Sequence, residues 1–238
     1  MSDSNPASKQ PQSKESKASL AFVDFAFFKF DRSWRQLDKK ERRQILGDVR
    51  ELLDRQDGID RIIPYTTLGI REDSDFLLWL IAAELDPIQR YLEKIIASRL
   101  GGYLSQPYSW LAMTRASTYT KRHAAAFEYG LEPLRYLVVY PFVKKREWYL
   151  LPFEERRKMI EEHSKVGRSF PKIRLNTTYS FGLDDQDFTL AFETDDLHDF
   201  QNLIISLREV EASRYTERDT PMIVCIKKTL EELFSGFL

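Results

Sequence analysis

The chain is poor in the residues that build cross-links and metal cages. Cys225 is the only cysteine among 238 residues. A single cysteine excludes an intrachain disulfide and a cage of several thiolates. Its apolar neighbours, residues 222–226, predict a buried strand thiol rather than a reactive one. There are only three histidines, so each can be weighed as a metal ligand in turn.

The chain also lacks a charge bias and a long hydrophobic run. Its 36 basic and 37 acidic residues give a formal charge of -1, which argues against nucleic acid or an anionic membrane surface as a partner. No stretch approaches the roughly 18 apolar residues of a membrane span. Residues 1–18 are rich in Ser, Lys, Gln and Pro, and they predict a disordered tail rather than a secretory signal. We therefore expect a cytoplasmic protein.

What the chain does have is an internal repeat. In residues 25–46 a short apolar strand leads through a basic turn with Trp34 into an amphipathic helix. Residues 137–160 repeat this order with Trp148 in the turn. In each repeat a hairpin, a helix and a closing strand follow, at residues 65–80, 86–98 and 108–113 and again at residues 176–192, 197–208 and 221–227.

Each repeat therefore has the order β-α-β-β-α-β, which is the ferredoxin-like motif. Such a unit covers one sheet face with helices and leaves the other face bare. Two copies in one chain can bury their bare faces against each other. We predict an α+β fold in which two ferredoxin-like repeats, residues 19–119 and 136–238, form a dimeric α+β barrel within one chain. Residues 120–135 connect them.

Two of the histidines fall on predicted helices. His198 lies among the carboxylates of residues 195–199 at a helix start, which is typical of a solvated surface residue. His163 shares an apolar helical face with Ile160 and Val166. An imidazole on such a face is a natural axial ligand for haem iron, although a hydrogen-bonded core histidine is the commoner explanation.

Two further residues are ambiguous by themselves. His123 falls in the connecting segment and would be an ordinary linker histidine. Tyr140 shares a strand face with Val138 and Phe142 and would be a core tyrosine. A tyrosine near a haem iron can also pass an electron or a proton.

The second half of the chain resembles the chlorite dismutase-like superfamily, and within it the coproheme decarboxylases of the coproporphyrin-dependent haem pathway. The matching stretches are Tyr140-Pro141-Phe142-Val143, Glu147-Trp148-Tyr149-Leu150-Leu151-Pro152, Glu154-Glu155-Arg156-Arg157, Glu162-His163, Asn176-Thr177, Ser180-Phe181-Gly182-Leu183-Asp184-Asp185 and Glu211-Ala212-Ser213-Arg214-Tyr215. The resemblance runs from about residue 120 to 235, and the first half matches more loosely as a degenerate repeat.

The resemblance implies roles for four residues. His163 would be the proximal iron ligand, and Tyr140 would be the redox tyrosine of the decarboxylases. His123 falls where one branch of the family has a distal histidine that acts as a general base. Trp148 would line the porphyrin.

Charged residues would complete the site. Lys144, Arg146 and Arg214 would receive propionates, which cationic hydrogen bonds suit well. The alternative for the basic turn is simple solvation. Glu211 would hydrogen-bond the far nitrogen of His163 and raise its basicity.

One departure separates the branches of the family. Chlorite-degrading members have a distal arginine on the strand before the Gly-Leu-Asp-Asp turn, and the corresponding residue here is Leu175. Arg174 is adjacent, but strand alternation sends it to the other face unless a bulge intervenes. Leu175 therefore favours the decarboxylases.

The function implied is peroxide-dependent decarboxylation of iron coproporphyrin III (coproheme) to haem b, the last step of coproporphyrin-dependent haem biosynthesis. A chlorite dismutase and a non-catalytic haem carrier are the alternatives. The resemblance also implies a homopentamer, with hydrogen peroxide as co-substrate and a coproporphyrin ferrochelatase as a candidate partner.

Overall fold

The computed structural model describes residues 20–53, 57–116, 119 and 125–238. The first half contains β1 (Phe22–Phe30), α1 (Lys39–Leu53), β2 (Arg61–Thr66), β3 (Phe76–Ala82), α2 (Leu85–Ala97) and β4 (Leu104–Met113). The second half contains β5 (Tyr136–Lys144), α3 (Arg146–Leu150), α4 (Phe153–Arg168), β6 (Arg174–Tyr179), β7 (Phe188–Thr194), α5 (Leu197–Arg208), β8 (Thr216–Arg218) and β9 (Ile223–Lys227), and α6 (Leu230–Ser235) follows it. Short 3-10 helices are η1 (Arg32–Gln36), η2 (Gly101–Tyr103), η3 (Ala126–Tyr129) and η4 (Glu211–Tyr215).

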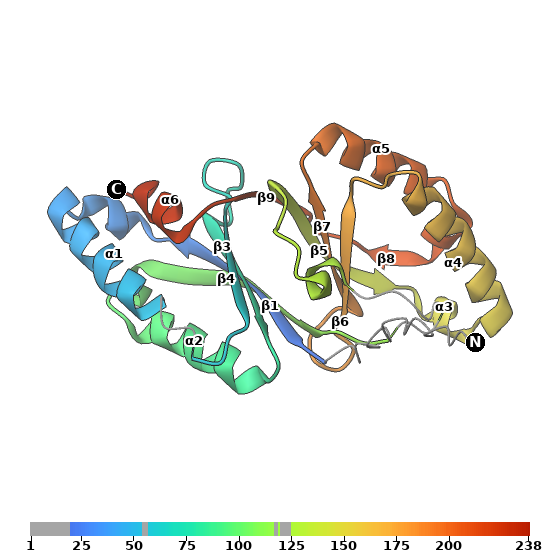
Figure 1. The fold of residues 1–238 in the computed structure, drawn as a ribbon, viewed down its shortest axis with the longest axis horizontal. Helices are drawn as coiled ribbons and strands as arrows, with labels where there is room; N and C mark the ends of the chain where they lie inside the picture. Colours follow the sequence, from blue (N-terminus) through green and yellow to red (C-terminus); the bar gives the residue numbers. More distant parts are fainter. Residues whose placement is uncertain (1–19, 54–56, 117–118, 120–124) are drawn as a thin grey trace, which may run out of the picture.

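The two halves have the same strand order, β4-β1-β3-β2 and β9-β5-β7-β6. Antiparallel pairing of β2 with β9 joins the halves on one side, and a single pair between Met113 of β4 and Tyr179 of β6 joins them on the other. The sheet therefore closes on itself, with the short β8 added outside on β5. The helices of each half lie on its outer side (Figure 1). The predicted α+β barrel of two ferredoxin-like repeats is confirmed.

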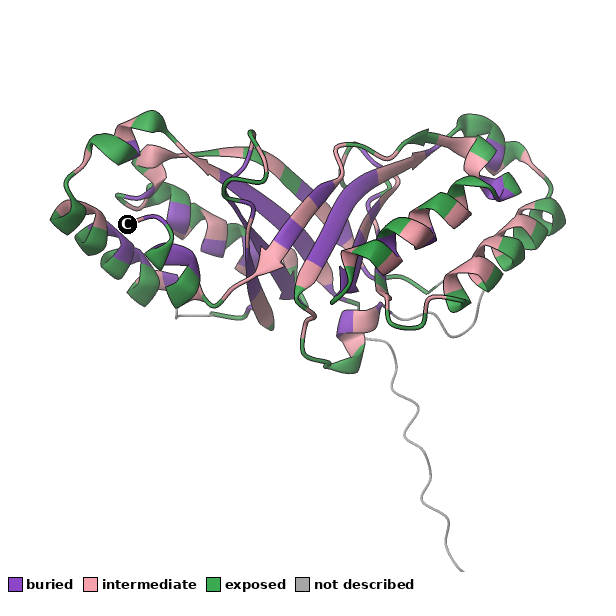
Figure 2. Ribbon diagram, turned by 90° about the horizontal axis from the view of Figure 1, so that it is seen from above, coloured by how far each residue is buried: buried purple, intermediate pink, exposed green. Residues whose placement is uncertain are grey.

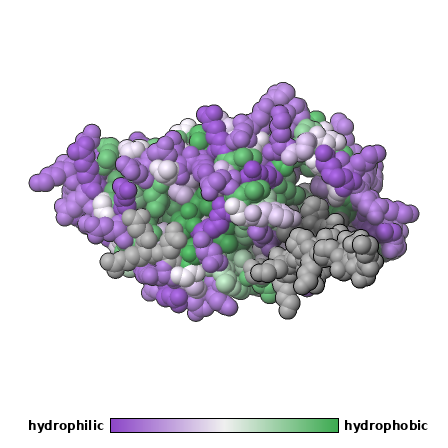
Figure 3. All heavy atoms as spheres, viewed as in Figure 1, coloured by the Kyte–Doolittle hydropathy of each residue, from purple (hydrophilic) through white to green (hydrophobic). Residues whose placement is uncertain are grey.

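The barrel interior holds one hydrophobic cluster, built from the inward faces of both repeats. Phe25 and Trp79 stack there with ring centres 5.2 Å apart, and Leu137 and Cys225 of the second half join them. Burial raises the pKa of the Cys225 thiol, so the sulfur behaves as a small apolar group, as the sequence predicts. Figure 2 shows the buried strands between exposed outer helix faces, and Figure 3 shows hydrophobic residues gathered over the strands.

The outer sides of the two sheets are filled differently. In the first half, α6 and the chain end pack under α1 although they follow the second repeat in sequence. The Phe237 ring lies 4.4 Å from the Phe30 ring, and Trp34 Nε1 donates to the Phe237 carbonyl at 3.1 Å. In the second half, α4 has no fully buried residue. The second repeat therefore keeps open a space that the first repeat fills.

No helix in the part of the chain that the structure describes is long and apolar enough to cross a membrane.

The carboxyl group of Asp24 on β1 predicts a specific pH dependence of stability. It is 2% exposed and accepts from Ser109 Oγ at 3.0 Å. Burial, with a smaller contribution from Asp184, raises its pKa from 3.8 to about 6. Between these pH values the folded protein holds a proton that the unfolded chain releases. Asp24 therefore lowers stability as pH rises from about 4 to about 6, by about 3 kcal/mol.

Asp24→Asn should remove this contribution. In urea denaturation at several pH values, the stability of the variant relative to the parent protein is expected to increase between pH 4 and pH 7. Parallel stability curves for the two proteins would contradict the assignment.

Candidate active site

The open space in the second half is a cavity of about 460 Å³ between the strands β5, β6 and β7 and the helices α4, α5 and η4. This volume suits a medium-sized organic ligand. Its walls are largely apolar and come from the sheet, from α4 and α5 and from the residue before β9: Phe142, Ile160, Leu190, Phe192, Leu207 and Met222.

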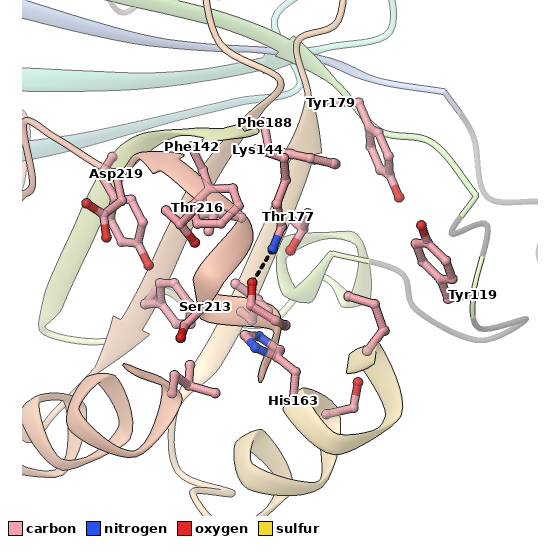
Figure 4. A pocket seen from close by; sticks show the side chains of 18 of the residues that line it. Tyr119, Phe142, Lys144, His163, Thr177, Tyr179, Phe188, Ser213, Thr216 and Asp219 are labelled. Atoms are coloured by element: carbon pink, nitrogen blue, oxygen red, sulfur yellow. Dashed lines mark hydrogen bonds between the residues drawn. The ribbon is translucent and has the colours of Figure 1, made fainter. Parts of the chain in front are cut away.

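His163 projects from α4 into this cavity (Figure 4). Ile160 lies one turn earlier on the same helix face and also lines the cavity. Burial, together with the nearby Lys144 ammonium, lowers the pKa of His163 to about 4. No described residue is hydrogen-bonded to either ring nitrogen. At neutral pH the imidazole is therefore neutral and has a lone pair available for a metal.

Lys144 ends β5 and lies beside His163. Its side chain is buried, and Nζ donates to the Ala212 carbonyl at 2.9 Å (Figure 4). The ammonium also lies 4.4 Å from the centre of the Trp148 ring, a favourable cation–π contact. Burial lowers the Lys144 pKa to about 8. Lys144 has no acidic partner within the described ranges, and its charge disfavours an imidazolium at His163.

Tyr140 lines the cavity from β5 and is 4% exposed. Its ring stacks on Phe192, with centres 6.0 Å apart. Burial and the charge of Asp219 raise the pKa of the phenol, so it keeps its proton at neutral pH. In the described part of the chain nothing accepts that proton. The phenol is a neutral group held at a fixed place on the cavity wall.

Leu175 and its neighbour Arg174 on β6 point to opposite faces of the sheet. The register between β6 and β7 runs without a shift from Arg174 to Tyr179, so no bulge intervenes. Leu175 faces the cavity, whereas the Arg174 guanidinium donates to the Glu132 carbonyl at 2.7 Å. The alternation predicted from sequence holds, and Arg174 does not line the cavity.

The remaining sequence-predicted residues are spread over different places. Trp148 is buried and lines the cavity, with its ring 5.5 Å from that of Tyr215. Arg146 begins α3 as an exposed residue outside the lining. Glu211 and Arg214 form an exposed ion pair at 3.3 Å, so Glu211 bonds to Arg214 and not to His163. His123 lies outside the described residues.

The structure adds residues that sequence reasoning missed. Arg156 and Arg115 line the cavity, as does Asp219, which pairs with Arg208 of α5. Arg156 lies seven residues before His163, and this two-turn spacing is a signal that the sequence contained. Nothing in the local sequence marks Arg115 or Asp219.

Tyr149 was also missed. It lines the cavity and hydrogen-bonds to Asp187, which precedes β7. Its hydroxyl donates to Asp187 Oδ2 at 2.7 Å, and the same oxygen accepts from the Lys144 backbone N–H at 2.8 Å. Asp187 therefore holds α3, which carries Trp148, against the end of β5, which carries Lys144. Both of these side chains line the cavity.

The fold is a duplicated α+β barrel, and a neutral imidazole projects into its apolar cavity. Proteins with such a site can bind a metal tetrapyrrole such as haem. The family model for chlorite dismutase matches residues 42–228, and the chain belongs to this family of haem-dependent enzymes.

Named relatives include two enzymes of this family. The coproheme decarboxylase of Mycolicibacterium smegmatis is 34% identical over 199 residues, which cover 82% of this chain and 86% of that protein. The chlorite dismutase of Ideonella dechloratans is 27% identical over 222 residues, covering 89% and 78%. Among solved structures, a variant of the chlorite dismutase from Candidatus Nitrospira defluvii has a TM-score of 0.85 at 25% identity, covering 93% of this chain and 96% of that one.

If His163 binds the iron, His163→Ala should abolish the shift of the absorption spectrum when ferric porphyrin is added. His198→Ala is a matched control, because His198 is a histidine on the outer helix α5 that does not line the cavity. Circular dichroism should show that both variants are folded. If the His163→Ala protein loaded with ferric porphyrin had the same absorption spectrum as the loaded parent protein, His163 would not be the iron ligand.

Proposed function

We propose that the protein catalyses the peroxide-dependent oxidative decarboxylation of iron coproporphyrin III to haem b. The observation that carries this proposal is that one apolar cavity presents both a neutral imidazole, His163, and an unpartnered neutral phenol, Tyr140. The similarity to a coproheme decarboxylase supports the same reaction.

The residues present fit an iron tetrapyrrole with acidic side chains. His163 offers a lone pair, and the walls offer aromatic and aliphatic surface to a flat ring. The lining also contains four basic residues against two acidic ones: Arg115, Lys144, Arg156 and Arg208 against Glu128 and Asp219. An excess of positive charge suits a ligand that carries carboxylates.

When bound, the tetrapyrrole iron supplies the oxidising chemistry with hydrogen peroxide. His163 holds the metal and fixes the ring within reach of the cavity wall. Tyr140 gives up its phenolic hydrogen as one proton and one electron, and then takes a hydrogen atom from the β-carbon of a propionate. We assign to His123 the removal of a proton from peroxide.

The overall reaction balances for each side chain. One propionic acid group and one hydrogen peroxide give one vinyl group, one carbon dioxide and two waters. The carbon–carbon bond to the carboxyl group breaks, the side chain loses two electrons, and the peroxide gains them. Two propionates react in turn, so two peroxides are consumed for each haem b.

Tyr140→Phe should stop this reaction and leave binding almost unchanged. The phenol has no hydrogen-bond partner among the described residues, so its removal should alter the dissociation constant of iron coproporphyrin by less than about threefold, or about 0.6 kcal/mol. The ring would still pack on Phe192.

Mass spectrometry of the porphyrin after peroxide addition measures the outcome directly. Tyr136→Phe, on the same strand but outside the cavity lining, is the matched control and should form product. Full conversion to haem b by Tyr140→Phe would overturn the proposed role.

The apolar side chain of Leu175 leads us to expect that the protein does not convert chlorite to chloride and oxygen. Leu175 offers no hydrogen-bond donor to an oxyanion, and Arg174 faces away. The haem-loaded protein should therefore release no oxygen from chlorite in an oxygen electrode, although the same sample reacts with hydrogen peroxide. Rapid oxygen release would favour a chlorite dismutase instead.

A further inference from the structure

The positive charges around the cavity are not equally available to a ligand. The Arg208 guanidinium is neutralised by the Asp219 carboxylate. The Lys144 ammonium is bonded to the Ala212 carbonyl. Among the described lining residues, Arg115 and Arg156 are left as arginines without a carboxylate partner.

Arg156 differs sharply from its neighbour on α4. Arg157 faces away from the cavity and pairs with Glu154 at 2.7 Å and with Glu161 at 3.4 Å. The Arg156 Nε is buried and has no hydrogen-bond partner in the described structure. A guanidinium cannot lose its charge, and a buried donor without an acceptor is costly. Because Arg156 also lines the cavity, an acceptor on a ligand there would satisfy this N–H.

The position of Arg156 relative to His163 suits a flat ligand. The two residues are separated by two turns of α4, or about 10 Å along the helix axis, and they lie on the same face. Ile160 lies between them and also lines the cavity. A planar ligand held by His163 would lie beside this face of α4, and a carboxylate at its edge would be within reach of Arg156.

Arg156 also lies at the end of the cavity away from Tyr140. Its guanidinium carbon is 5.9 Å from the centre of the Phe153 ring, and Phe153 stacks on Tyr119. Tyr140 instead lies near Asp219 and Arg208, whose charges affect the pKa of its phenol. Tyr119 and Asp219 lie at opposite sides of the cavity (Figure 4).

We propose that Arg156 binds a carboxylate that does not react, and so anchors the tetrapyrrole with its reacting edge toward Tyr140. This inference rests on the proposed function. A guanidinium and a carboxylate can form two parallel hydrogen bonds, which fix an orientation as well as adding affinity. Because the anchored carboxylate survives the reaction, Arg156 holds substrate and product alike.

Equilibrium titration of the full chain with three iron porphyrins tests this anchor. The ligands are iron coproporphyrin III, haem b and the dimethyl ester of haem b, followed by porphyrin absorption and by quenching of tryptophan fluorescence. Arg156→Ala should weaken the first two by a similar factor, about ten- to a hundredfold, because one charged hydrogen-bonded pair is lost from each. Binding of the ester should not change.

Two variants control for effects on the helix. Arg157→Ala removes the neighbouring, already paired guanidinium and should leave all three affinities unchanged. Arg156→Lys keeps the charge but loses the two-pronged geometry, so its affinities should fall between those of Arg156→Ala and the parent protein.

The other outcomes separate the anchor from the proposed function. If Arg156→Ala weakened the binding of iron coproporphyrin alone, Arg156 would bind a carboxylate that reacts, and the proposed anchor would be wrong. Equal affinities for Arg156→Ala and the parent protein would also overturn it, while leaving the proposed function intact. A parent protein that binds none of the iron porphyrins would overturn both.

Discussion

The mutual burial of the two bare sheet faces is the constraint on which the rest of the structure depends. It fills the barrel interior with side chains such as Phe25, Trp79 and Leu137. The cavity that His163 lines is instead on the outer side of the second sheet, beneath helices. In the first repeat α6 and Phe237 close the corresponding space, and in the second repeat it stays open. Of the two repeats, the second therefore presents the apolar cavity that His163 lines.

The open cavity sets the protonation states of the groups that face it. Burial lowers the pKa of His163 and raises that of Tyr140, so both are neutral at physiological pH. Lys144 adds to the effect on His163, because its ammonium makes a second nearby positive charge unfavourable. The same apolar surroundings thus provide a free lone pair at one place and a retained hydrogen at another. Both are needed for the proposed chemistry.

The sequence carried enough information for the fold and for the short-range geometry of the site. The repeat predicted the barrel, helical spacing placed His163 on an apolar face, and strand alternation separated Leu175 from Arg174. It did not place the ends of long side chains, which several rotatable bonds can carry in different directions. Glu211 thus bonds to Arg214, and the Lys144 ammonium lies inside the protein beside His163. The packing of α6 on the first repeat, a long-range contact, also has no local signal.

The two ends of the cavity differ in a way that matters for the proposed reaction. At the Tyr140 end, the Arg208 charge is cancelled by the Asp219 carboxylate. At the far end, the Arg156 charge is uncompensated among the described residues. If Arg156 is the anchor proposed above, a ligand with carboxylates on several sides is held more firmly at that edge than at the other. The loosely held edge is the one from which a carboxyl group has to leave as neutral carbon dioxide, and a strong ion pair there would oppose that departure.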